Sequence, residues 1–349
     1  MYNFRKTNVD KGFYDKERIV KFKIKTIKEY FQKYENNLPV EKEYKSLHIE
    51  YNREGNKTLF IRYSKDNIEF YRDEFIYNEN NILIKKNEKH GNYESFLTYE
   101  YDKKNRLIEV IDLYFEDRKS ENETPKKPRL KLILKEYDES DNLIKEEYCG
   151  GGTMTLIYTY DENNLIKVRI KIFEEFDDSD ERTLLKIGKK NYFYDKKNNL
   201  IKTEKYNVED TIIENGYYKI PDYEEISETK IFDYDDRNNL LLEISLHNIY
   251  KFKTYIRSYK AFSYNSKNNL LVKLEYDKEN KLEYSEEYNY DKTGELVLKA
   301  IRLTDEEFRG GFSHFEAFYD YNNNLLERVN YNENGEVISK IRVGYNYFE

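Results

Sequence analysis

The 349-residue sequence contains no tryptophan, one cysteine, two methionines and four prolines. The single cysteine, Cys149, excludes an internal disulfide framework and any zinc site built on several thiolates. No apolar run approaches the roughly 20 residues that a membrane-spanning helix needs, so we expect no membrane partner. The first 25 residues are rich in charge and contain no apolar stretch. They therefore predict no secretory signal and a cytoplasmic location.

The sequence also has no large excess of either positive or negative charge. The chain carries 60 basic and 68 acidic side chains, which gives a formal net charge of −8. This balance describes a mixed surface and disfavours direct binding to nucleic acid, which usually needs a basic excess. Alanine, the best helix former, occurs only at positions 261, 300 and 317, whereas the sequence has 37 tyrosines and 20 phenylalanines. This composition favours strands over helices.

A short unit recurs along the chain. It reads Tyr, Asp or Asn, two polar residues, Asn or Gly, one further residue, then Leu or Ile. One copy is Tyr194-Asp195-Lys196-Lys197-Asn198-Asn199-Leu200, and Tyr331-Asn332-Glu333-Asn334-Gly335 has the glycine form. Similar units begin at Tyr51, Tyr77, Tyr101, Tyr137, Tyr160, Tyr234, Tyr264, Tyr276, Tyr290 and Tyr319, with that at Tyr160 one residue shorter.

Each unit has the features of a β-hairpin turn. Tyr ends a strand, and the Asp or Asn side chain accepts hydrogen bonds from the backbone of the turn. The following Asn or Gly tolerates the positive φ that tight hairpins require. The apolar residues between turns follow a strand period. We therefore expect an all-β fold, a long antiparallel meander of about twenty strands that forms a curved or spiral sheet.

The Tyr-Asp-x-x-Asn/Gly-x-Leu unit resembles the YD repeats of the RHS family, whose hairpins form a spiralling β-sheet. About ten copies between Tyr77 and Tyr331 carry the resemblance, which covers most of the chain. Most copies have Asn where the family usually has Gly, and nothing in the sequence resembles the toxin domain of long RHS proteins. The resemblance implies an architecture and no particular activity.

The N-terminal region departs from the repeat. Val20, Ile24, Ile27, Phe31 and Tyr34 follow a helical period, and Asp15 can cap a helix that begins there. These residues predict one amphipathic helix within 15–36, either a cap on an exposed sheet edge or a docking helix. The predicted domains are an N-terminal segment over 1–40 with this capping helix and a repeat body over 41–349.

Three segments interrupt the repeat, at 117–129, 174–182 and 304–314. Irregular connections on a regular scaffold often carry specificity. The sequence therefore predicts a partner-binding role for the charged residues that gather in these segments. These residues are Lys126, Lys127, Arg129, Asp178 and Arg309.

Catalytic patterns find little support. The four histidines are far apart in sequence, and Gly150-Gly151-Gly152 is not followed by the Lys-Ser/Thr of a phosphate loop. The acidic run 174–181 lacks the glycine and alternation of a calcium loop. Cys149 has no neighbouring base in sequence that would make it a nucleophile. We therefore expect no catalytic residue, no metal and no cofactor.

These observations favour a non-catalytic protein that binds another protein. An inhibitor or immunity protein of bacterial or phage origin, which blocks its partner, is one form of this hypothesis. Two alternatives remain open: an enzyme that processes glycans or peptides in a groove on the sheet, and a structural or adhesive repeat protein. The abundant tyrosines fit either packing on a thin sheet or a recognition face.

Overall fold

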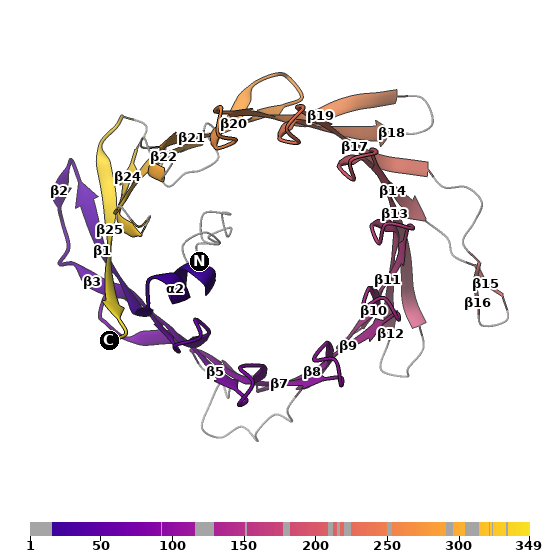
Figure 1. The fold of residues 1–349 in the computed structure, drawn as a ribbon, viewed down its shortest axis with the longest axis horizontal. Helices are drawn as coiled ribbons and strands as arrows, with labels where there is room; N and C mark the ends of the chain where they lie inside the picture. Colours follow the sequence, from indigo (N-terminus) through magenta and orange to yellow (C-terminus); the bar gives the residue numbers. More distant parts are fainter. Residues whose placement is uncertain are drawn as a thin grey trace. The chain divides into compact units, whose positions relative to one another are not determined.

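The described part of the chain folds as an antiparallel meander of β-strands with one short helix, which confirms the predicted fold class (Figure 1). The computed structural model describes residues 16–91, 93–115, 129–150, 152–176, 182–208, 212–214, 217–219, 225–249, 253–290, 296–303, 314–320, 322, 324–332 and 334–349. Within these residues, no helix is long and apolar enough to cross a membrane.

The chain forms two compact units. Unit 1 comprises Met1–Thr98, Tyr114–Pro128 and Tyr284–Glu349, and unit 2 comprises Tyr99–Leu113 and Arg129–Glu283.

In unit 1, strand β1 lies between the first and last parts of the chain. It pairs with β3 on one side and with β25 on the other, and β2 pairs with its end. The elements assigned mainly to unit 1 are α2 (Lys16–Lys21), β1 (Ile24–Glu35), β2 (Leu38–Pro39), β3 (Tyr44–Tyr51), β4 (Lys57–Tyr63), β5 (Glu69–Tyr77), β6 (Leu83–His90), β7 (Tyr93–Tyr101), β21 (Leu282–Tyr290), β22 (Leu296–Leu303), β23 (His314–Tyr319), β24 (Leu325–Tyr331) and β25 (Val337–Tyr347).

In unit 2, strands pair in chain order from β9 to β14 and from β17 to β20, and β14 pairs with β17. The strands β15 and β16 form a separate small hairpin. The elements of unit 2 are β8 (Leu107–Phe115), β9 (Arg129–Tyr137), β10 (Leu143–Cys149), β11 (Thr153–Tyr160), β12 (Ile166–Phe176), β13 (Arg182–Tyr194), β14 (Leu200–Val208), β15 (Ile212–Glu214), β16 (Tyr217–Lys219), β17 (Glu225–Tyr234), β18 (Leu240–Ile249), β19 (Lys253–Tyr264) and β20 (Leu270–Asp277).

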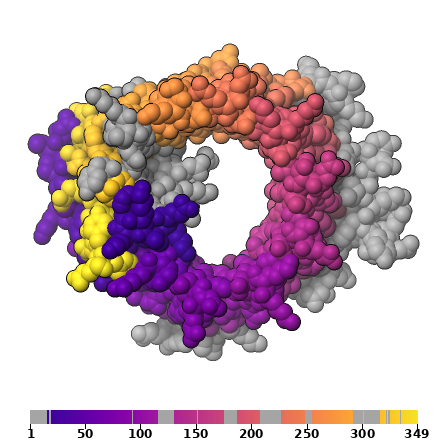
Figure 2. Space-filling model, viewed as in Figure 1, coloured from indigo at the N-terminus to yellow at the C-terminus, as the bar shows by residue number. Residues whose placement is uncertain are grey.

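The largest apolar core among the described residues belongs to unit 1. Ile19 of α2 packs with Ile24 and Ile27 of β1 and with Ile49 of β3, and each is at most 1% exposed. Figure 2 shows the first described residues lying directly against the C-terminal strand, in agreement with the pairing of β1 and β25. By contrast, every residue of β20 is half-buried, whichever face its side chain occupies. A strand with this pattern belongs to a sheet that is only thinly covered on both faces.

The predicted extent of the N-terminal helix is wrong. Among the described residues of the predicted range, the helix spans Lys16–Lys21, and Ile24–Glu35 form β1. A β-bulge explains the misleading period: Ile24 pairs with Tyr347 but Thr26 pairs with Asn346, so Lys25 is an extra residue. The extra residue brings Ile24 and Ile27 to the same face of the strand. Their three-residue spacing therefore fits the period of a helix although the residues lie in a strand.

The helix rests on the turn between β3 and β4. Lys16 Nζ donates a hydrogen bond to Asn56 Oδ1 at 2.6 Å. Gly55 has a φ of +75°, and a Cβ atom placed there would lie 2.6 Å from Val20 Cγ2 and 3.0 Å from the Lys16 carbonyl oxygen. Most other turns hold Asn at the equivalent positive φ. Glycine is needed here because the helix leaves no room for a side chain.

We expect Gly55→Asn to lower the free energy of unfolding by about 1–3 kcal/mol through this overpacking. Gly335→Asn is the matched control, because Gly335 has a similar φ of +78° and nothing lies within 4 Å of its added Cβ. Urea unfolding of the two variants measures the difference. Equal stabilities would show that α2 does not press on the β3–β4 turn.

Candidate functional site

The repeated turn has a fixed hydrogen-bond pattern. In the copy that begins at Asp195, the backbone N–H of Asp195 donates to the Asn199 carbonyl at 2.9 Å. The carboxylate oxygen Asp195 Oδ1 accepts from the backbone N–H groups of Lys197 and Asn199, both at 2.8 Å. Asn198 takes a φ of 65°. The sequence assignment of Asp to turn bonding and of Asn to positive φ is thus confirmed.

The same main-chain pattern recurs at two sites that sequence reasoning missed or misjudged. Ser64 begins a turn with Asn67 at positive φ, and its hydroxyl replaces the usual carboxylate or amide. The turn at Asp161 has full length, because Leu165 occupies the place of the usual second Asn. The described turns of this type begin at Asn52, Ser64, Asn78, Asp102, Asp138, Asp161, Asp195, Asp235, Asn265, Asp277, Asp320 and Asn332.

Several anchor tyrosines join their turn to an earlier turn of the repeat. Tyr194 Oη donates to the carbonyl oxygen of Ile166, the first residue after the preceding turn, at 3.0 Å. Tyr160 does the same to Leu143 at 2.7 Å, and Tyr234 to Leu200 at 3.1 Å. Tyr137 and Tyr264 make the same bond, and Tyr77 donates to the Lys57 carbonyl, which follows the turn at Asn52. These tyrosines are therefore structural.

A second set of bonds links the turns through their side chains. Asn199 Nδ2 donates to Asn238 Oδ1 of the next turn at 3.2 Å, and Asn239 Nδ2 donates to Asn268 Oδ1 at 3.1 Å. We call these contacts the turn ladder. They give a reason for Asn in place of Gly: the residue at positive φ also supplies an acceptor to its neighbour.

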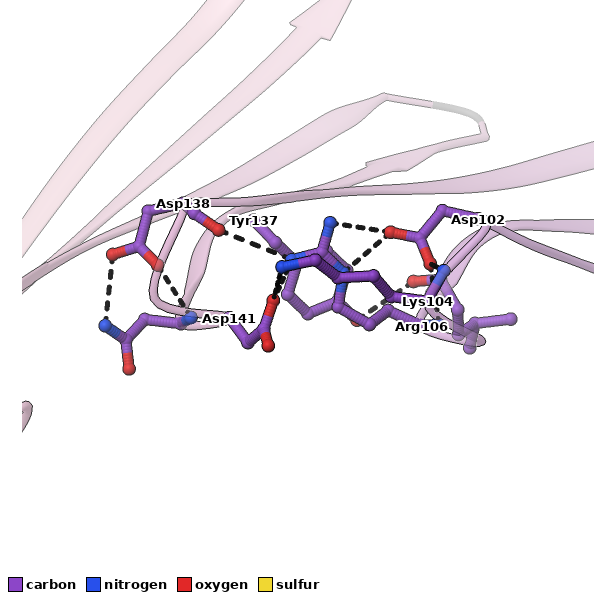
Figure 3. A network of polar contacts seen from close by, with 8 residues as sticks. Asp102, Lys104, Arg106, Tyr137, Asp138 and Asp141 are labelled. Carbon is purple, nitrogen blue, oxygen red and sulfur yellow. Dashed lines mark hydrogen bonds and ion pairs between the residues drawn. The ribbon is translucent and has the colours of Figure 1, made fainter.

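Figure 3 shows the most highly charged step of the turn ladder. Arg106 donates to Asp102 within its own turn and to Asp141 of the next turn, where Lys104 also binds at 2.7 Å. The Arg106 guanidinium lies 4.8 Å from the centre of the Tyr137 ring. Bonds from Lys104 and Arg106 hold the pKa of the Asp141 carboxyl below its ordinary value. All of these charges are satisfied locally, so this step stabilises the turn edge.

In unit 2, the strand ends next to two interruptions of the repeat lie at the edge opposite to most of the repeat turns. In unit 2, the turns after β9, β11, β13, β17 and β19 share one edge, since connections alternate between the two ends of an antiparallel meander. Phe176 and Arg182, which flank the predicted segment at 174–182, end and begin strands at the opposite edge. Arg129 begins β9 at that edge.

The other predicted partner-binding residues, Lys126, Lys127, Asp178 and Arg309, lie outside the described residues. Their role, like that of Arg129, stays a prediction. The other chemical candidates can be placed. Burial and the neighbouring Glu147 carboxylate raise the pKa of the Cys149 thiol, which disfavours the nucleophilic thiolate. Within the described part of the chain, no group of three or more His, Cys, Asp or Glu could hold a metal ion.

One row of side chains on unit 2 is not electrostatically balanced. Arg169 of β12 pairs directly with Lys190 of β13, and Lys190 pairs directly with Lys205 of β14. Paired residues project from the same face of a sheet, so three cations lie side by side on neighbouring strands. We call Arg169, Lys190 and Lys205 the cation row. Tyr158 pairs with Arg169 at one end, and Glu228 pairs with Lys205 at the other.

Other charged pairs in the same unit alternate in sign. Lys135 pairs with Glu146 and forms an ion pair with it at 2.8 Å, and Lys260 pairs with Glu275. In the cation row, by contrast, no ion pair within the described residues joins any of the three cations to a carboxylate. Lys190 Nζ instead lies 5.2 Å from the centre of the Tyr192 ring. The cation row is therefore the candidate binding site.

Sequence reasoning missed this site. Its members are about 20 residues apart and come together only through strand register.

No protein-family model matches the sequence, and the comparison with curated proteins finds no match. Among solved structures, the chain is similar to a porin-like protein from Bacteroides uniformis ATCC 8492, with 8% identity, a TM-score of 0.29, and coverage of 73% of this chain and 90% of that one. A porin-like protein from Bacteroides vulgatus ATCC 8482 gives 9% identity, a TM-score of 0.24, and coverage of 76% and 98%. A TcdB2-TccC3-TEV structure gives 9% identity and a TM-score of 0.16, over 91% of this chain and 25% of that one.

We expect Tyr194→Phe to lower the free energy of unfolding by about 1 kcal/mol, because the Ile166 carbonyl loses its hydrogen bond. Tyr192→Phe is the matched control on the same strand, since the Tyr192 hydroxyl makes no hydrogen bond to the described residues. Urea unfolding of both variants tests this role. If Tyr194→Phe is as stable as the control, the anchor hydroxyls do not support the sheet.

Proposed function

We propose that the chain is a non-catalytic, cytoplasmic protein that binds another protein through the face of unit 2 that carries the cation row. We also propose that it is a divergent YD-type repeat protein. The support for this second proposal is local: Tyr, Asp and a residue at positive φ fill the same places in one turn geometry along the chain.

The cation row is the observation that carries the binding proposal. Arg and Tyr are enriched in protein interfaces, where Tyr contributes rigid contact area and Arg makes directional hydrogen bonds. Here Tyr158 and Tyr192 flank Arg169 and Lys190. Three neighbouring like charges weaken the free sheet. A partner that supplies opposite charge would therefore gain affinity from their neutralisation.

Blocking of the partner, as in an inhibitor or immunity protein of bacterial or phage origin, is the form of this function that we propose. A broad sheet face that carries its own charge pattern can cover a partner surface without any chemical step. The residues predicted from the sequence, Lys126, Lys127, Arg129, Asp178 and Arg309, are the second proposed contact region.

Capture of the tagged protein from its own host tests the proposal, with two charge-reversed variants in parallel. We expect the wild type to retain a partner at about 0.15 M salt, near physiological ionic strength. The triple variant Arg169→Glu, Lys190→Glu, Lys205→Glu should lose it, through at least a roughly tenfold weaker affinity.

The triple variant Lys126→Glu, Lys127→Glu, Arg129→Glu measures the contribution of the second contact region. Retention of the partner by the cation-row variant, with loss in this second variant, would move the site to that region. Two results would show that the proposed binding function is wrong: the wild type retains no protein, or it retains only proteins that both charge-reversed variants also retain.

A further inference from the structure

The positive charges of the cation row repel one another, so a bound anion would stabilise them. Lys190 is half-buried, and burial followed by the positive charges of Arg169 and Lys230 lowers its pKa, with Lys205 acting in the same direction. Glu228 opposes them, but it makes no ion pair with Lys190. Lys230 is already bound to Glu243 at 2.9 Å. The folded protein therefore holds Lys190 as a cation at a cost that an added anion would remove.

Arg169 adds a second, geometric observation. Its Nε atom is buried and has no hydrogen-bond partner among the described residues. A buried donor without an acceptor is costly, and the guanidinium fork is shaped to bind a carboxylate or phosphate through two parallel bonds. The row thus offers both a directional donor and uncompensated charge on one sheet face.

The size of the row limits what it can bind. Neighbouring strands lie about 4.8 Å apart, so Arg169 and Lys205, two strands from each other, span about 10 Å. Tyr158 ends the row on one side, and the Glu228 carboxylate ends it on the other. The space suits one or two oxyanions. A long phosphate chain would be repelled by the Glu228 carboxylate. It would gain no cation from Lys230, which is already paired with Glu243.

We propose that Arg169, Lys190 and Lys205 bind a pair of carboxylates on an extended acidic segment of the partner protein. Side chains two residues apart on such a segment lie about 7 Å from each other on one face, so both fit within the span of about 10 Å that the row covers. The rings of Tyr158 and Tyr192 border the same face and can pack on the intervening residues. The identity of the partner as a protein rests on the proposed function, whereas the oxyanion site does not.

A synthetic peptide of eight alternating Glu and Ser residues, labelled with a fluorophore, tests the site directly by fluorescence polarisation at about 50 mM salt. We expect it to bind the wild type and to bind Lys190→Gln at least about tenfold more weakly. Lys189→Gln is the matched control, because Lys189 is the adjacent residue on the opposite face and contacts the Tyr206 ring. It should change the affinity by less than about twofold.

Inorganic phosphate and single-stranded DNA of eight nucleotides serve as competing probes. Displacement of the peptide by millimolar phosphate supports a shared oxyanion site. Tighter binding of the DNA than of the peptide would overturn the assignment to carboxylates. Failure of the peptide to bind, or equal binding by the wild type and Lys190→Gln, would overturn the site.

The melting temperature of Lys190→Gln separates a binding lysine from a structural one, because the two roles predict changes of opposite sign. Without peptide, we expect Lys190→Gln to melt at a higher temperature than the wild type, because it removes one of three adjacent like charges. With peptide, the wild type should gain stability and Lys190→Gln should not. A lower melting temperature for free Lys190→Gln would show that this cation stabilises the fold, and the proposal would be wrong.

These measurements separate the two proposals. Peptide binding that depends on Lys190, together with no captured partner from the host, would leave the carboxylate site standing and contradict the proposed function. Capture of a partner through the cation row, together with no binding of the acidic peptide, would leave the function standing and contradict the carboxylate assignment.

Discussion

The thin sheet of unit 2 depends on bonds between neighbouring hairpins at its turn edge. Its described core cluster of buried apolar residues contains only Ile172 and Ile187. Much of the cohesion must therefore come from lateral contacts: backbone pairing, the hydroxyl bonds from anchor tyrosines such as Tyr194 to the preceding hairpin, and the side-chain turn ladder. This constraint explains why Asp and Asn recur so regularly at the turns. They satisfy the local backbone and at the same time reach the neighbouring hairpin.

A regular scaffold of this kind also makes departures from its rules informative. Lys135 and Glu146 show the ordinary arrangement, in which a charge finds its opposite on the next strand. Arg169, Lys190 and Lys205 depart from it on three successive strands. Natural sequences tend to break local rules at functional sites. The same reasoning separates the cation row from Arg106 and Asp141, whose charges are fully paired within the turn ladder.

The fold was predictable because its signals are local. Tyr194, Asp195 and Asn198 specify a turn within five residues, and register then follows from the hairpin. Ser64 escaped notice because a hydroxyl can replace the carboxylate in the same bonds. The predicted N-terminal helix was too long because a bulge at Lys25 gave the apolar residues of a strand the spacing of a helix. The cation row could not be read from spacing, since it exists only across strands that pair at a distance in sequence.

The claim that side-chain bonds between turns hold the sheet together is tested most directly by Asn238→Gly against Asn280→Gly. Both residues have a φ near +65°, at 65° and 63°, so glycine keeps either turn. Asn238 accepts a bond from Asn199 of the neighbouring turn, whereas the Asn280 side chain makes no such bond to the described residues. We expect Asn238→Gly to cost about 0.5 kcal/mol more in urea unfolding. Equal costs for the two variants would contradict the turn ladder.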